Sequence, residues 1–185
     1  MLITILLWIK LISALAAFGI LIFVAFIMFS FRDMVPFVPT PRKMLKKIIN
    51  LADIKDNERV VDLGSGSGRI IIAVAKKYKK NLVVGVEKSF SLRLFNKFFL
   101  FFHPFLKKRV QVINKDFFNL DLTEFDVIFC FLTPEALRIL LPKFQFLKPG
   151  SRIVSYMFAL DNSQGFEEYT EYATSKDSIY LYKKI

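Results

Sequence analysis

Residues 59–68, RVVDLGSGSG, decide the fold of this chain, and RIIIAVAKKYKK follows them at residues 69–80. The β-branched residues predict a short buried strand, and the residues after the glycines have the apolar spacing of a helix. Gly64, Gly66 and Gly68 let the backbone turn tightly and approach a ligand, while the helix start offers free N–H groups. The stretch therefore predicts a strand, loop and helix that bind a nucleotide-like ligand.

Acidic residues occupy the ends of three predicted strands. Asp62 lies near the end of the first strand, Glu87 directly follows LVVGV at residues 82–86, and Asp116 follows a third run, VQVI. In open α/β sheets, ligands bind beyond the carboxyl ends of the strands, where an acid after the second strand holds two ribose hydroxyls. A carboxylate beside a ring, as in Asp116–Phe117, suits an adenine. Taken singly, each acid also fits a helix cap or a solvated turn.

These segments look like the successive motifs of class I S-adenosylmethionine (SAM)-dependent methyltransferases, namely VDLGSGSGRI, GVEKS, NKDFF and LKPGSRIVSY. The resemblance covers residues 36–185. PFVPTP at 36–41, FLTPEAL at 131–137 and the closing IYLYKKI are similar, more narrowly, to small protein-lysine methyltransferases. That group comprises archaeal enzymes and the mitochondrial membrane-bound enzymes that modify the c subunit of ATP synthase and the adenine nucleotide translocase. The resemblance implies an α/β fold with a seven-stranded, Rossmann-like sheet, and SAM as the cofactor.

The same resemblance assigns binding roles to individual residues of the motifs. The implied SAM-binding residues are Asp62, Gly64, Ser65, Gly66 and Gly68 around the methionine part, Glu87 at the ribose, and Asp116 with Phe117 at the adenine. A dehydrogenase is the competing interpretation of a glycine loop with a distal acid. Its G-x-G-x-x-G spacing would require glycine at position 69, where Arg69 stands, so the loop favours the methyltransferase.

The fourth predicted strand, FDVIFCF, leads into Leu132-Thr133-Pro134, the candidate methyl-transfer site. Many enzymes that methylate the amino groups of nucleic-acid bases carry an Asn-Pro-Pro-aromatic run there, and this chain does not. A lysine amine must be neutral to attack the methyl group, and apolar surroundings such as Phe37, Val38, Leu132 and Pro134 would lower its pKa. The backbone carbonyls of the Leu132–Thr133 turn and the Thr133 hydroxyl would orient the amine. An equally good interpretation is a helix start, with Thr133 as N-cap and Pro134 at the first position. The sequence assigns no catalytic side chain.

The amino-terminal segment has the character of a membrane anchor. Lys10 is the single ionisable side chain within residues 1–31, and residues 11–31 are 21 uncharged residues, long enough for a transmembrane helix. A cleaved signal peptide or a buried core helix are the alternatives. We expect an anchor at 1–31, a linker at 32–41 whose prolines favour extended chain, and a catalytic domain at 42–185.

The charges that flank the apolar segment predict its orientation. Lys10 stands alone on the amino side, whereas five basic residues follow the span: Arg32, Arg42, Lys43, Lys46 and Lys47. By the positive-inside rule the catalytic domain is cytoplasmic. A single cysteine, Cys130, agrees with a reducing compartment.

Composition narrows the class of partner. The chain of 185 residues is 54% hydrophobic, which excludes a disordered polymer, and its net charge of +11 favours an anionic partner or surface. One cysteine and one histidine argue against a metal site. The helix expected at 89–102 is apolar over half its circumference, so it is either well buried or an exposed aromatic patch on anionic lipid.

Together these features predict a single-pass membrane methyltransferase that uses SAM to methylate a lysine side chain of a protein, most readily a membrane protein. Membrane lipid is the expected second partner, and neither nucleic acid nor metal is expected. Two alternatives remain. One is a methyltransferase acting on a membrane-resident small molecule, such as a quinone or lipid, and the other is a SAM-binding module without turnover.

Overall fold

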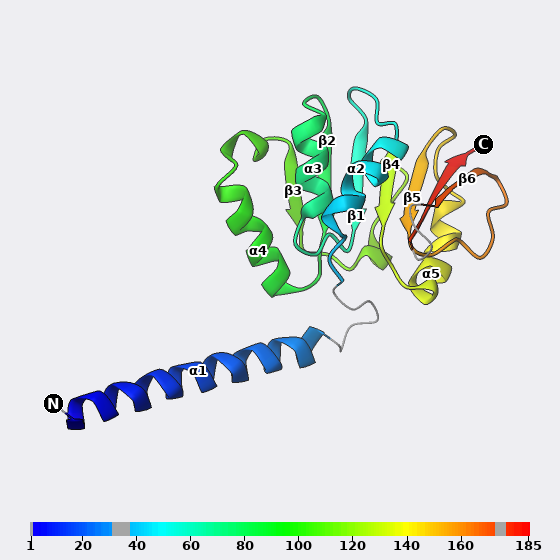
Figure 1. Ribbon diagram of the computed structural model, residues 1–185. Coiled ribbons are helices and arrows are strands. Elements are labelled where there is room, and N and C mark those ends of the chain that lie inside the picture. The colour runs from blue at the N-terminus through cyan, green and yellow to red at the C-terminus, as the bar shows by residue number, and fades with distance from the viewer. Residues whose placement is uncertain (1, 31–37, 173–176) are drawn as a thin grey trace. The chain divides into compact units, whose positions relative to one another are not determined.

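The computed structural model describes residues 2–30, 38–172 and 177–185, and the chain divides into two compact units, Met1–Phe37 and Val38–Ile185 (Figure 1). The first unit contains helix α1 (Leu2–Ser30). Within it, Thr4–Ala25 is long and apolar enough to cross a membrane, a test that a signal sequence also passes. The helix begins at Leu2 rather than Leu11, so Lys10 falls inside this 22-residue stretch.

The second unit alternates helices and strands, as the sequence predicts. Its elements are α2 (Arg42–Leu51), β1 (Arg59–Leu63), α3 (Arg69–Lys77), β2 (Leu82–Val86), α4 (Phe90–Phe101), η1 (Pro104–Leu106), β3 (Val110–Ile113), η2 (Phe117–Asn119), β4 (Val127–Cys130), α5 (Pro134–Phe144), β5 (Arg152–Tyr156), β6 (Phe166–Tyr172) and β7 (Ser178–Lys184). The compact unit begins at Val38, so part of the PFVPTP segment belongs to it.

Several elements are shorter than their apolar runs. The fourth strand spans only Val127–Cys130 of FDVIFCF, and the fifth ends at Tyr156 because Met157 has a φ of 76°, which an extended strand cannot contain. The sequence pattern did not predict the strand at Phe166–Tyr172, FEEYTEY. It pairs with β7 in the antiparallel direction.

The seven described strands form one sheet in the order β3-β2-β1-β4-β5-β7-β6. The first five strands in this order, β3, β2, β1, β4 and β5, are parallel to one another. Strand β7 runs antiparallel to both β5 and β6. This arrangement confirms the predicted seven-stranded, Rossmann-like α/β fold. The chain reverses its strand order between β1 and β4, which is where open α/β sheets bind ligands.

Side chains alternate between two buried faces of the parallel strands. Val60 and Val127 join one core cluster with the apolar faces of α2 and α3, whereas Val61 and Ile128, next to them in sequence, are buried outside that cluster. Burial on both faces explains why the strands read as continuous apolar runs. Helix α4 lies beside β3, the edge strand of the sheet (Figure 1).

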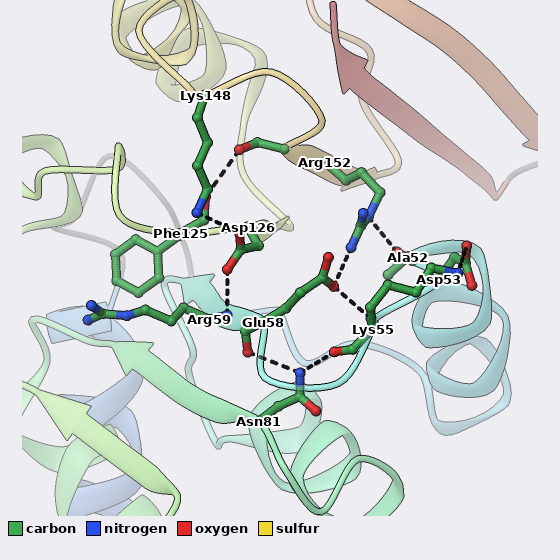
Figure 2. Close-up of polar contacts among 11 residues, drawn as sticks. Ala52, Asp53, Lys55, Glu58, Arg59, Asn81, Phe125, Asp126, Lys148 and Arg152 are labelled. Atoms are coloured by element: carbon green, nitrogen blue, oxygen red, sulfur yellow. Dashed lines mark hydrogen bonds and ion pairs between the residues drawn. The ribbon is translucent and has the colours of Figure 1, made fainter.

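A polar network joins the amino-terminal ends of the parallel strands (Figure 2). The Arg152 guanidinium pairs with the Glu58 carboxylate, and both side chains are largely buried. The Asn81 amide donates to the Glu58 carbonyl at 3.0 Å, and the Asp126 carboxylate accepts from the backbone N–H of Arg59 at 2.7 Å. These hydrogen bonds and this ion pair lie at one edge of the sheet, and the opposite edge is left for the candidate site.

Candidate functional site

The predicted site residues lie at the carboxyl ends of adjacent parallel strands. The register pairs Leu63 at the end of β1 with Val86 of β2 and with Cys130 of β4. The segments that follow these strands therefore meet at one edge of the sheet. This placement results from the parallel topology, since sequence distance alone does not bring residues 62, 87 and 132 together.

The glycine loop is folded tightly against the end of β2. The backbone N–H groups of Gly64 and Ser65 both donate to the Val86 carbonyl at 2.9 Å. Gly64 and Gly68 have φ values of 73° and 78°, which favour glycine. Gly85 on β2 makes room for the loop, because a Cβ there would lie 2.7 Å from the Ser65 hydroxyl oxygen. The loop thus presents backbone, rather than side chains, toward a ligand.

Asp62 is a buried carboxyl group at this edge, with 4% of its surface exposed. Burial raises the pKa of Asp62 to about 8, and the nearby negative charge of Glu87 acts in the same direction. The charged form of a buried carboxyl group with a raised pKa becomes more favourable when a cation binds next to it. It can therefore contribute to binding a positively charged ligand.

Glu87 fixes the shape of the glycine loop. Its Oε2 accepts a hydrogen bond from the Gly66 N–H at 2.8 Å, and its Oε1 accepts one from the Ser89 N–H at 2.8 Å. Each carboxylate oxygen can accept more than one hydrogen bond, so a contact to ribose hydroxyls stays compatible with these two. The ribose role itself stays a prediction.

Asp116 and Phe117 form the third part of the site, after β3. The Asp116 carboxylate accepts from the Phe118 N–H at 3.1 Å and pairs with the Lys88 ammonium at 3.2 Å. The Phe117 ring lies 3.8 Å, and the Leu132 side chain 3.5 Å, from the position that a Cβ on Gly64 would occupy. Gly64 is therefore flanked by two apolar side chains, one from each neighbouring predicted motif.

The Leu132-Thr133-Pro134 turn begins helix α5. The Thr133 hydroxyl oxygen accepts from the Ala136 N–H at 3.3 Å, and Pro134 occupies the first turn of the helix, which confirms the helix-start interpretation. Leu132 is buried beside Gly64. Val38 is exposed, and Phe37 lies outside the described residues. The structure therefore places Leu132 beside the glycine loop, whereas the Val38 side chain is exposed.

Asn96 of α4 is part of the site that the sequence analysis missed. It is completely buried, and its amide donates to the Gly66 carbonyl at 2.6 Å. A Cβ on Gly68 would lie only 1.9 Å from the Asn96 Oδ1 atom, so this side chain fills the space that the glycine leaves. The sequence offered one sign of this role. Asn96 is a single amide within a Phe-rich helix, and it lies one helical turn before Leu100, on the same side of the helix.

More than half of the chain, residues 62–166, matches the family model of the ANTKMT methyltransferase domain. The chain belongs to the ANTKMT methyltransferase family. The matched region contains the glycine loop, Glu87, Asp116 and the Leu132 turn. Membership in the family confirms the predicted methyltransferase and its SAM cofactor.

Curated relatives agree with the family. A protein-lysine N-methyltransferase of Saccharolobus islandicus is 34% identical over 132 residues, which cover 71% of this chain and 81% of the relative. A Caenorhabditis elegans relative, named as a lysine N-methyltransferase of the ATP synthase C subunit, is 22% identical over 83% of this chain and 82% of its own length.

A solved structure of similar fold is that of an RNA methyltransferase from Salinibacter ruber in complex with S-adenosylhomocysteine. It has a TM-score of 0.72 and 28% identity, and the match covers 80% of this chain and 94% of that one. The sheet order found here and this similarity confirm the class I methyltransferase fold.

The residues of the ANTKMT domain fit SAM as a ligand. SAM carries an ammonium and a sulfonium cation, which suit the buried Asp62 carboxyl group. The Ser65 hydroxyl is buried with no hydrogen-bond partner among the described residues, so a ligand can supply one. The Phe117 ring offers an apolar surface next to the loop.

Proposed function

We propose that this ANTKMT-family enzyme is anchored in a membrane and transfers a methyl group from SAM to a lysine side chain of a membrane protein. Support for a lysine substrate comes from the Saccharolobus islandicus relative, a protein-lysine N-methyltransferase. Its alignment with this chain covers most of both proteins. The Caenorhabditis elegans relative, whose name gives the C subunit of ATP synthase as its target, supports a membrane target. The apolar Thr4–Ala25 helix supports the anchor.

We assign the parts of the cofactor to residues at the strand ends. The methionine part would contact Asp62 and the loop Gly64, Ser65, Gly66 and Gly68. Glu87 would hold the ribose, while Asp116 and Phe117 would hold the adenine. The buried Asp62, the orphan Ser65 hydroxyl and the ring of Phe117 beside Gly64 support this assignment.

SAM supplies an electrophilic methyl group with its own leaving group, so the protein needs to position a neutral amine rather than to donate protons. The apolar side chains of Leu132 and Phe117 flank the loop on the side where the strands end. Burial against them would lower the pKa of a substrate lysine, and the Leu132 and Thr133 carbonyls together with the Thr133 hydroxyl would orient its amine. Methyl transfer should therefore accelerate as the pH approaches the lowered pKa of that amine.

The anchor would keep the catalytic domain close to the bilayer. Eight Cα–Cα steps separate Ser30, the end of α1, from Val38, so the connection spans at most about 26–29 Å when fully extended. Such tethering raises the effective concentration of membrane targets over soluble ones. Basic residues after the helix favour a cytoplasmic catalytic domain.

Mass spectrometry of membranes tests the proposal. Membranes are prepared from source cells that lack this protein. They are incubated with the purified full chain and with SAM carrying a labelled methyl group. We expect label on a lysine of a membrane protein, and its loss with Glu87→Ala. The matched control is Glu124→Ala, at an exposed position outside the site, which should keep activity. Label on a quinone, a lipid or RNA instead of lysine would contradict the proposed substrate. SAM binding without any labelled product would support the non-catalytic alternative.

A further inference from the structure

Helix α4 and the following turn η1 expose an unusual number of large apolar side chains. We call them the aromatic patch, and its members are Phe90, Leu94, Phe95, Phe98, Phe99, Phe101, Phe102 and Phe105. Phe98, Phe101 and Phe105 are 60%, 66% and 89% exposed. The structure thus decides between the two interpretations of this helix, because most of its phenylalanines are not buried. An exposed apolar patch of this size on one helix indicates an interaction surface.

The side of α4 that carries Asn96 and Leu100 is buried, which leaves the aromatic patch exposed. Asn96 is buried against the glycine loop and donates to the Gly66 carbonyl, and Leu100 is the other buried residue of the helix. The Arg93 guanidinium donates to the Lys88 carbonyl at 2.8 Å. Rotating the helix to bury the phenylalanines would break these hydrogen bonds and expose the loop.

The segment that carries the aromatic patch has charges of one sign, and Asp116, directly after it, pairs with Lys88. Residues 88–115 contain no Asp or Glu and seven basic residues, namely Lys88, Arg93, Lys97, Lys107, Lys108, Arg109 and Lys115. The Lys107 ammonium lies 5.2 Å from the ring centre of Phe101, and the Arg93 guanidinium lies 5.7 Å from that of Phe90. Cations are therefore interleaved with exposed rings, a pattern that complements an anionic surface with an apolar interior.

We propose that the aromatic patch docks the catalytic domain on the anionic headgroups of a phospholipid bilayer. Phenylalanine rings would enter the boundary between headgroups and acyl chains, while Lys97, Lys107 and Lys108 contact the phosphates. The patch lies on the same chain as a helix that can span a membrane. Single-stranded RNA also binds rings and cations, but stacking platforms for bases combine them in a groove. Here the rings stand on one exposed helix and turn, which suits insertion into lipid.

Docking through this face would place the cofactor loop directly behind the bilayer-bound helix. Asn96 contacts the Gly66 carbonyl from the inner side of α4, and the patch occupies the outer side. The lipid contact would thus hold the domain in a defined orientation rather than merely near the membrane. This inference does not depend on which molecule is methylated, because its test reads lipid contact and not activity.

The experiment measures immersion of a spin label on α4 in the full chain, reconstituted at one copy per lipid nanodisc. The label is placed at the exposed Ser91 as Ser91→Cys. The native Cys130 stays unlabelled because it is buried, and burial raises the pKa of its thiol. Nanodiscs contain phosphatidylcholine alone or with about one-third phosphatidylserine, the fraction being set to give a strongly anionic surface. Collisions of the label with oxygen and with a nickel chelate report its depth.

We expect at least a threefold higher ratio of oxygen to nickel accessibility in anionic nanodiscs than in detergent. The triple variant Phe98→Ser, Phe101→Ser and Phe105→Ser should abolish the increase, whereas the matched control Phe146→Ser, at another exposed phenylalanine, should retain it. Lys107→Glu with Lys108→Glu should reduce the increase, and Lys76→Glu with Lys79→Glu should not. All replaced side chains are exposed, so each variant should fold, which circular dichroism checks.

Three results would overturn the proposal. The first is equal label accessibility in anionic nanodiscs and in detergent. The second is protection that appears only with two copies per disc, which would identify a second copy of the chain as the occupant. The third is protection by single-stranded RNA in detergent with none by lipid, which would identify the patch as an RNA surface.

Discussion

At the scale of single residues, the site combines one carboxyl group that favours its neutral form with another that is fixed by backbone N–H groups. Asp62 is buried and near Glu87, whereas Glu87 accepts from Gly66 and Ser89. Both acids lie at the end of a parallel strand, yet their surroundings give them different tasks. In the proposed site Asp62 would respond to a cationic ligand, whereas Glu87 holds the loop in shape.

Asp62 should make the ligand-free protein less stable as the pH rises. Its pKa is about 8 in the fold and 3.8 ordinarily, so between these values the folded state holds a proton that the unfolded state has lost. The free energy of unfolding should therefore fall by about 1.4 kcal/mol per pH unit across this window through this residue. Asp62→Asn should remove that dependence. Urea unfolding at pH 5, 6, 7 and 8 measures it, and parallel curves for both proteins would contradict the burial of a neutral acid.

Glu87→Ala should weaken SAM binding by about 1.5–3 kcal/mol, the contribution of a hydrogen bond to a charged group. The variant also removes the acceptor of the Gly66 N–H. Glu87→Gln keeps one amide oxygen as an acceptor, so it should disturb the loop less and still lose affinity. Isothermal titration calorimetry with SAM measures the change. Unaltered affinity in Glu87→Ala would remove Glu87 from the proposed ribose site.

At the scale of elements, the glycine loop depends on a helix that lies one β-strand further along the chain. Helix α4 supplies Asn96, which holds the Gly66 carbonyl and fills the space beside Gly68. The loop, β2 and α4 therefore form one packed unit. A change on α4 should reach the cofactor even though the outer side of the helix consists of exposed apolar side chains.

Gly68→Ala and Gly150→Ala form a matched pair. Both glycines have a positive φ, 78° and 83°, so each substitution carries a backbone strain of about 1–2 kcal/mol. Only at Gly68 would the new Cβ meet a side-chain atom at 1.9 Å, whereas nothing lies within 4 Å at Gly150. Gly68→Ala should thus cost more stability and lower SAM affinity as well. Thermal unfolding and calorimetry measure both quantities.

The clash at Gly68 predicts a coupling with Asn96. Removing the Asn96 amide by Asn96→Ala takes away the atom that the new Cβ would meet, so the double variant should lose less stability than the sum of the two single variants. Additive losses would show that Asn96 and Gly68 are not in contact. Asn50→Ala, at an exposed helix position, serves as the control and should be additive with Gly68→Ala.

Substitutions of Thr133 can distinguish a structural role of its side chain from a role at the substrate. As the N-cap of α5 it accepts from the Ala136 N–H, so Thr133→Ala should lower the free energy of unfolding by about 1 kcal/mol. Thr133→Asn keeps a capping oxygen but has no hydroxyl group, and it should restore stability. If methyl transfer is also restored, the hydroxyl has no part in orienting the amine. A loss of activity with stability intact would support its role at the substrate.

At the scale of the whole molecule, an apolar helix and a catalytic domain are joined by a short connection. The helix unit and the catalytic unit each have their own composition, since Lys10 is the only charge within residues 1–31 and the catalytic unit carries most of the net charge. If the helix spans a membrane, the chemistry takes place within reach of that surface.

Cysteine labelling should report the amino end outside the cell and the carboxyl end inside. Single cysteines are introduced by Ile3→Cys or Ile185→Cys, and intact cells are treated with a maleimide that does not cross membranes. We expect labelling at position 3, and at position 185 only after permeabilisation, because the basic residues follow the span. Labelling at position 185 in intact cells would reverse the proposed topology. Complete removal of residues before the domain would indicate a cleaved signal segment.

The sequence alone determined the fold class, the family and the edge of the sheet where the acids meet. These features follow from local patterns: β-branched runs, glycines at fixed spacing and an acid at the end of three strands, all of which can be recognised without knowing any distant contact. The strand β6 was not predicted, because FEEYTEY has its aromatic residues at every third position and so lacks the apolar-polar alternation that indicates a strand.

The tertiary structure alone decided which way α4 faces and how the loop is held. A helix that is apolar over half its circumference does not indicate which side meets the sheet, since hydrophobic spacing predicts burial and here one Asn is buried while the phenylalanines are not. The deciding contacts join residues thirty positions apart, Asn96 to Gly66, and Glu87 to Gly66 across twenty-one. Hydrogen bonds between such distant residues form only once the parallel strands have placed the loop and the helix side by side.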